Sequence, residues 1–302
     1  MTTMTALLAA DAARIKDGIN ALMARSRIER EREYEGIVVI NPDGNRSWAE
    51  LDIEGRRIQD RVMEDYRQYR DLVQVLTRSL PADGLSEFKQ ADDQVTKHVE
   101  QQRSTWCESV PEAKAKTLEA VDALQALLER LYSVEGETII VPDTNALLLA
   151  PTLDQWAFDW CERFTIVFTP TVLSELDELK IAHKNPDVRA KAEKMIRQIK
   201  ELGRRGDLRT GVPVVTGKIT ARSVAVEPKV SDSLPWLDAA NNDDRFLASA
   251  VELIRRNVRA IVVIVTADIN LQNKSGHARI PVVEPPDTGA ASTVAAIAQE
   301  TA

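Results

Sequence analysis

The apolar residues of the first 134 positions recur at the spacing of helices. Members of the first apolar stripe are seven, four and three residues apart, which places them on one helix face: Leu8, Ile15, Ile19 and Leu22. Similar stripes predict three more helices, at about residues 51–80, 85–99 and 118–131. We therefore predict a mostly α-helical N-terminal domain over residues 1–134, built as a bundle or as long hairpins.

Shorter patterns add detail to this helical domain. Residues 36–40 (GIVVI) form a β-branched run, and the turn-like residues 41–45 (NPDGN) follow it, which predicts a β-hairpin. His98 lies among polar neighbours, and we interpret it as an exposed side chain. We find no pattern typical of catalysis here, so we expect these helices to serve other roles, including a homo-oligomer interface.

After Gly136 the hydrophobic pattern changes from long stripes to short β-branched runs. The runs are at residues 138–141, 164–168, 223–226 and 261–265. Helical stretches separate them, at about residues 153–161, 171–182, 187–205 and 243–256. Strands that alternate with helices are typical of crossover connections and a parallel sheet, so we predict an α/β domain over residues 135–286. Residues 287–302 are mostly small or polar and are expected to form a flexible tail.

Composition and charge narrow the class of protein. The net charge of -8 and the pI near 5.2 argue against a protein that coats nucleic acid by bulk charge. Cys107 and Cys161 belong to no CxxC pair, which predicts reduced thiols and a cytoplasmic location. No stretch resembles a signal peptide, and the longest aliphatic run, residues 260–265, is too short to cross a membrane.

Acidic residues follow the two strongest predicted strands. Asp143 follows the run at 138–141 after Pro142, and Asp268 comes soon after the run at 261–265. Because ligands bind beyond the carboxyl ends of parallel strands, both acids are placed where chemistry is expected. Glu175 lies beside the apolar stripe of a helix, and Asp243 or Asp244 opens another. Hard oxygen donors of this kind suit Mg²⁺ or Mn²⁺.

Each of these acids also has an ordinary structural explanation. A turn explains the position of Asp143, with Thr144 or Asn145 as the cap of the next helix. Glu175 is explained as an ordinary acid on a helix surface. Asp243 and Asp244 fit first-turn acids that interact with the helix dipole. Two strands that each deliver an aspartate to one sheet edge are harder to explain without a bound cation.

Taken together, these motifs resemble the PIN domain family over residues 136–286. Four strings carry the resemblance: VPDTNALLL (141–149), SELDELK (174–180), NNDDRFLASA (241–250) and VTADINLQNK (265–274). The resemblance implies a three-layer α/β/α fold with a parallel sheet and metal-dependent hydrolysis of phosphodiester bonds, usually in RNA. It assigns the catalytic and metal-binding acids to Asp143, Glu175, Asp243 and Asp268, with Asp244 as the rival for the third position. By analogy, Asn145 and Ser174 orient ligands or water.

A basic segment adjoins the second motif. Residues 180–222 contain twelve Lys or Arg and four Asp or Glu, so their net charge is +8 (12 minus 4) and that of the remaining chain is -16 (-8 minus 8). Part of this charge belongs to an ordinary solvated helix face. The rest is suited to bind the backbone of single-stranded RNA, through Lys180, Lys184, Arg189 and Lys218. Trp236 is expected either to pack under a loop or to stack on a base.

Three functional hypotheses follow. The first is a metal-dependent endoribonuclease that uses Mg²⁺ or Mn²⁺. The second is a non-catalytic PIN module that binds RNA or a protein partner. The third, a phosphatase of the haloacid dehalogenase type, requires a second aspartate two residues after the first, where this chain has Asn145. We therefore rank the third hypothesis low and the first highest.

Overall fold

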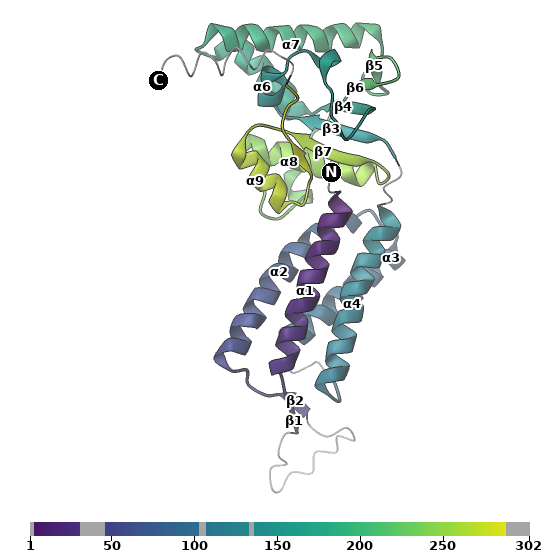
Figure 1. The fold of residues 1–302 in the computed structure, drawn as a ribbon, viewed down its shortest axis with the longest axis vertical. Helices are drawn as coiled ribbons and strands as arrows, with labels where there is room; N and C mark the ends of the chain where they lie inside the picture. The colour runs from purple at the N-terminus through teal and green to yellow at the C-terminus, as the bar shows by residue number, and fades with distance from the viewer. Residues whose placement is uncertain (1–2, 31–45, 103–106, 133–135, 288–302) are drawn as a thin grey trace. The chain divides into compact units, whose positions relative to one another are not determined.

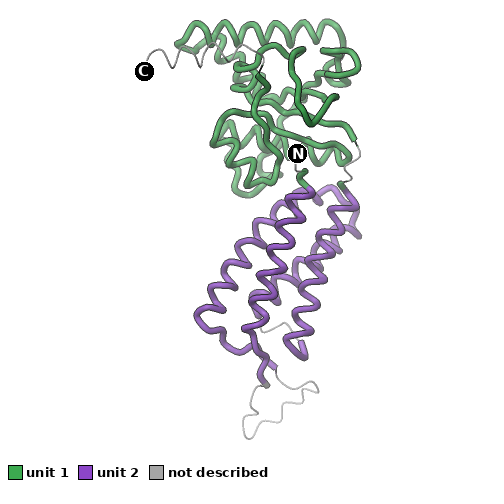
Figure 2. Tube along the Cα trace, viewed as in Figure 1, with its two compact units in different colours: residues 1–4, 132–302 green, residues 5–131 purple. Residues whose placement is uncertain are grey.

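The computed structural model describes residues 3–30, 46–102, 107–132 and 136–287. The chain divides into two compact units: a helical unit, residues 5–131, drawn in purple, and an α/β unit, residues 1–4 with 132–302, drawn in green (Figure 2). The hairpin predicted at residues 36–45 lies outside the described residues, as does all of the predicted tail beyond Asp287. No helix among the described residues is both long and apolar enough to cross a membrane.

The helical unit contains long helices, as the apolar stripes predict. Its helices are α1 (Met4–Arg25), α2 (Ile53–Thr77), α3 (Ala82–Val99) and α4 (Val110–Leu131) (Figure 1). The stripes supply its core, and Ile15, Tyr66 and Leu124 are completely buried. Asp52 caps α2 by accepting a hydrogen bond from the Gly55 backbone N–H at 2.6 Å. Two short strands, β1 (Ile28–Arg30) and β2 (Arg46–Trp48), pair antiparallel.

The prediction of an exposed His98 is wrong. Its side chain is buried, and Nε2 lies 3.2 Å from Sγ of the buried Cys107. His98 follows the buried Val95 by three residues, and that spacing places both side chains on the same face of α3. The polar neighbours in sequence occupy the other faces of the helix, so they do not report its environment.

The α/β unit contains a sheet with strand order β5-β6-β4-β3-β7-β8. The strands are β3 (Thr138–Pro142), β4 (Phe164–Phe168), β5 (Val212–Val215), β6 (Ile219–Ser223), β7 (Ile261–Val265) and β8 (Val282–Val283). All neighbouring pairs are parallel except β5 and β6. The central strands are buried on both faces, as expected when helices cover a parallel sheet.

Helices lie on both sides of this sheet and complete the predicted three-layer α/β/α arrangement (Figure 1). They are α5 (Thr144–Leu149), α6 (Pro170–Ala182), α7 (Pro186–Arg205), α8 (Asn242–Arg256) and α9 (Ile269–His277). Thr169 caps α6, and its hydroxyl oxygen accepts a hydrogen bond from the Val172 backbone N–H at 3.4 Å. Helix α6 packs against α7, and the two follow β4 in the chain.

Two predicted elements of this unit are wrong. The strand expected at 223–226 is β6, at Ile219–Ser223, because Ile219 pairs with Phe164 at the start of β4. The helix expected at 153–161 is one short 3₁₀ turn, Leu153–Gln155. There the Trp156 indole N–H donates to the Ala150 carbonyl oxygen at 2.8 Å, which holds the chain in a loop.

Candidate active site

Asp143 and Asp268 lie at the carboxyl ends of neighbouring strands. Pro142 of β3 pairs with Val265 of β7, and the Asp143 backbone N–H donates to the Val265 carbonyl oxygen at 3.0 Å. Because the two strands end together, the acids that follow them reach the same edge of the sheet. Each acid also caps the helix that it precedes, α5 for Asp143 and α9 for Asp268.

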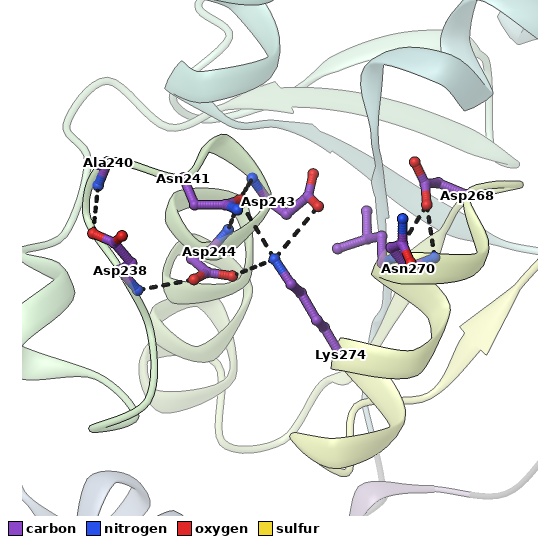
Figure 3. Close-up of polar contacts among 9 residues, drawn as sticks. Asp238, Ala240, Asn241, Asp243, Asp244, Asp268, Asn270 and Lys274 are labelled. Carbon is purple, nitrogen blue, oxygen red and sulfur yellow. Dashed lines mark hydrogen bonds and ion pairs between the residues drawn. The ribbon is translucent and has the colours of Figure 1, made fainter.

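These caps fix the carboxylates. Oδ1 of Asp143 accepts a hydrogen bond from the Ala146 backbone N–H at 2.6 Å. Asp143 itself is therefore the cap, and the prediction that Thr144 or Asn145 caps this helix is wrong. Oδ1 of Asp268 accepts from the backbone N–H groups of Asn270 and Leu271 at 2.7 and 3.3 Å (Figure 3).

Thr266 links the two acids, and the sequence patterns do not identify it. Its hydroxyl donates to Oδ2 of Asp143 at 2.5 Å, and its hydroxyl oxygen accepts from the Asp268 backbone N–H at 2.9 Å. Thr266 is completely buried, so water does not compete for these hydrogen bonds. The signal in the sequence is its place between the end of β7 and the acid, in the string VTAD.

Glu175 approaches from the other side of β3. It lies on α6, the helix that follows β4, and its side chain is half-buried. Thr144 donates its hydroxyl hydrogen to Oε2 of Glu175 at 2.5 Å. Thr144, directly after Asp143, therefore holds the second acid, a role that no local pattern in the sequence indicates.

One cavity of about 440 Å³ is shared by four of the predicted acids, Asp143, Glu175, Asp243 and Asp268. Among the described residues, no three Asp, Glu, His or Cys side chains are close enough to hold one metal ion between them. Asn145 also lines the cavity. The acids therefore surround a common space without forming a compact cluster.

Asp243 and Asp244 occupy different environments at the start of α8. Asp243 is half-buried and lines the cavity. Asp244 is buried, and its carboxylate accepts from Nζ of Lys274 at 2.7 Å and from the Asp238 backbone N–H at 2.8 Å. Asn241 caps the helix and accepts hydrogen bonds from the backbone N–H groups of both aspartates (Figure 3). The geometry thus gives Asp243 access to the shared space and gives Asp244 protein partners.

The acids affect one another's ionisation. The pKa of Asp143 is raised to about 6, mainly by burial and to a lesser extent by the charges of Asp268 and Glu175, against the opposing hydrogen bonds from Thr266 and Ala146. Asp143 is only 7% exposed, so desolvation is the natural leading cause. At neutral pH the carboxylate is mostly ionised in a site with an excess of negative charge.

The predicted RNA-binding residues lie in different places. Lys180 and Lys184 lie at the end of α6, where His183 lines the cavity. Nη1 of Arg189 donates to the carbonyl oxygens of His183 and Lys184 at 2.6 and 3.2 Å, which ties α7 to this end of α6. Lys218 instead precedes β6, and its carbonyl oxygen accepts from the backbone N–H at the start of β4. The length of β6, about 16 Å, therefore separates Lys218 from the acidic edge.

Trp236 is neither fully buried nor fully exposed. Its indole ring contacts the imidazole ring of His277 edge-on, with the ring centroids 5.2 Å apart, and 37% of the residue is exposed. The ring therefore contacts the last residue of α9 and leaves part of its surface accessible.

Residues 140–285 match the family model of the PIN domain. A search of curated proteins found no match to the chain. The matched range contains all the acids of the cavity, and PIN domains are a nuclease-type family. The α/β unit of this chain, with its mostly parallel sheet and its acidic cavity at the carboxyl edge, belongs to the PIN domain family.

Proposed function

We propose that the chain is a metal-dependent endoribonuclease that hydrolyses RNA phosphodiester bonds in the acidic cavity. The observation that carries this proposal is the convergence of Asp143, Glu175, Asp243 and Asp268, from four separate elements, on one cavity at the carboxyl edge of the sheet. The match to a nuclease-type family supports the same reaction class.

The acids fit a hard divalent cation such as Mg²⁺ or Mn²⁺. They offer carboxylate oxygens in a site where burial, and to a lesser extent the charges of Asp268 and Glu175, raise the pKa of Asp143, and a cation offsets both effects. Mg²⁺ commonly keeps several waters and is bound through one or two carboxylates, so three converging acids are not required. Asp143 and Asp268 would hold the ion, and Glu175 and Asp243 would contribute from the cavity wall. When bound, such an ion activates water and stabilises charge on a phosphate.

The chain's own side chains are arranged to hold the acids still. An ionised carboxylate offers about four lone-pair positions, so hydrogen bonds from Thr266 and the Ala146 N–H to Asp143 leave lone pairs for coordination. Thr144 holds Glu175 in the same way. Pre-positioned charges avoid reorganisation during the reaction. Asn145, on the cavity wall, and Ser174, beside Glu175, would orient water or substrate.

Single-stranded RNA is the substrate that the surrounding charge favours. Lys180 and Lys184 lie beside His183 at the cavity, and Arg189 anchors the first turn of α7 there. Helix α7 then extends for 20 residues, about 30 Å, and carries basic side chains on its exposed face. Such a helix would bind the phosphates that flank the scissile bond.

A non-catalytic module that binds RNA or a protein partner is the second candidate. The observation in its favour is that no three potential ligands converge on one point among the described residues. This hypothesis predicts RNA binding that is insensitive to chelator and to Asp143→Asn.

The test compares cleavage of a labelled single-stranded RNA by the wild-type chain, Asp143→Asn and Asp177→Asn, with Mn²⁺ or Mg²⁺. Asp177 is an exposed acid on α6, so its variant controls for the loss of one negative charge. We expect cleavage by the wild type and by Asp177→Asn, and none by Asp143→Asn or with EDTA, while circular dichroism shows all chains folded. RNA that the metal-loaded wild type binds but leaves intact would support the non-catalytic hypothesis.

A further inference from the structure

Lys274 reaches from α9 to the start of α8. Its Nζ lies 2.7 Å from Oδ1 of Asp244, 3.5 Å from Oδ2 of Asp243 and 3.4 Å from Oδ1 of Asn241 (Figure 3). An ammonium group has three N–H donors, and three oxygens of the protein surround this one. Lys274 is therefore bound by its neighbours and is not a loose surface lysine.

The three oxygen donors are held by other parts of the chain. The Asp244 side chain is buried, and its second oxygen accepts from the Asp238 backbone N–H at 2.8 Å. Asn241 is fixed because it accepts from the backbone N–H groups of Asp243 and Asp244 at 2.9 and 3.3 Å. Two carboxylates and one amide carbonyl, fixed in this way, are the donors that a hard divalent cation uses.

The same lysine belongs to the helix that Asp268 caps. Asp268 opens α9, and Lys274 follows it on that helix. The ion pairs from Lys274 to Asp243 and Asp244 therefore connect these two acids to α9, the helix that Asp268 caps. A buried carboxylate such as Asp244 requires a partner charge, and Lys274 provides it.

We infer that Lys274 is a positioning residue whose ammonium occupies a cation site formed by Asn241, Asp243 and Asp244 at the border of the cavity, so that the chain takes one divalent ion and not two. The inference rests on the proposed function, because it assigns that ion to Asp143 and Asp268. Asp243 then contacts the tethered ammonium and borders the cavity, whereas Asp244 bonds only to protein groups, Lys274 and the Asp238 backbone N–H, in the described residues.

The test is the stoichiometry of Mn²⁺ binding to the full chain, measured by calorimetry and by electron paramagnetic resonance of unbound Mn²⁺. We expect one ion per wild-type chain, and a second, weaker ion when Lys274→Met removes the ammonium. Lys274→Arg keeps the charge and is expected to restore one ion. Lys16→Met is the matched control, because Lys16 forms a 2.7 Å ion pair with Asp122 in the helical unit; it is expected to bind one ion.

A second variant tests the inference if Lys274→Met does not fold. Asp244→Asn is expected to leave the Mn²⁺ affinity within about threefold of the wild type, whereas Asp268→Asn is expected to weaken it by tenfold or more. Two ions on the wild type, one ion on folded Lys274→Met, or equal losses in Asp244→Asn and Asp268→Asn would overturn the inference and leave a metal-dependent nuclease intact. A wild type that binds no Mn²⁺ would overturn both proposals.

Discussion

Thr266 donates its hydroxyl hydrogen to Oδ2 of Asp143 at 2.5 Å, across 123 positions of sequence. The same hydroxyl oxygen accepts from the Asp268 backbone N–H at 2.9 Å. One buried hydroxyl therefore sets the relative position of the two acids that follow β3 and β7. If Asp143 and Asp268 hold the metal ion, Thr266 determines the geometry of that site without contacting the ion.

Thr266→Val is expected to destabilise the metal-free protein by about 1–3 kcal/mol, because it leaves a buried carboxylate oxygen and a backbone N–H without this partner. It should also raise the pKa of Asp143, since the Thr266 hydrogen bond lowers it. Thr266→Ser keeps the hydroxyl and should recover most of the stability. Urea unfolding of the three chains measures the effect, and equal stabilities of the valine and wild-type chains would contradict it.

The raised pKa of Asp143 predicts a specific pH dependence. Burial holds this pKa near 6, against 3.8 for an ordinary aspartate, so the folded state binds the proton more tightly than the unfolded state. The contribution to stability is therefore fully present below about pH 4 and is lost as the pH rises through 6. The difference of about two pKa units corresponds to about 3 kcal/mol.

Urea unfolding in EDTA between pH 4 and 7.5 isolates this contribution when Asp143→Asn is the reference chain. The free energy of unfolding of the wild type, relative to that of the variant, should fall as the pH rises from 4 to 7.5. A difference that is constant over this range would show that the folded-state pKa of Asp143 is not raised.

Gly136 lies two residues before β3 and allows the close approach of Arg259, two residues before β7. A Cβ at this position would lie 1.9 Å from the carbonyl oxygen of Arg259, and a backbone atom cannot move aside as a side chain does. Gly136→Ala should therefore destabilise the α/β unit by about 2 kcal/mol, measured by thermal or urea unfolding. Gly276→Ala in α9 is the control, because no described atom outside its own helix and chain neighbours lies within 4 Å of the added methyl. It should be neutral or stabilising by up to about 1 kcal/mol.

The fold and the strand-end acids are predictable because their signals are local. Asp143 closely follows one β-branched run, and Asp268 closely follows another, so the order of the chain alone places both at a strand end. The helices of the helical unit are equally evident from their apolar stripes, which become the buried faces of α1 to α4. These features require only the period of the pattern and the position at which it stops.

The supporting contacts are not predictable in this way, because their partners are distant in the sequence. Thr266 and Asp143 are separated by 123 positions and Lys274 and Asp244 by 30, so no local pattern joins them. The position of Lys218 depends on β5, a short strand that the patterns do not reveal. Since β5 and β6 pair antiparallel, the turn between them places Lys218 at the sheet edge opposite the acids.

The exposed face of α7 provides the sharpest test of RNA as the ligand. Lys194 and Arg197 are exposed, one turn apart, on the helix whose first turn is anchored beside the cavity. If each binds one RNA phosphate, replacing both with Gln should weaken binding of a short oligouridine. The slope of log affinity against log salt concentration should also fall by about 1.4, because each phosphate contact on a single strand contributes about 0.7.

Fluorescence anisotropy across a salt series, with Ca²⁺ replacing Mg²⁺ to limit cleavage, measures both quantities. Gln at the exposed Arg61 and Lys89 of the helical unit makes the same change in net charge and should leave the slope unchanged. Equal slopes in all three chains would mean that α7 does not carry the RNA backbone.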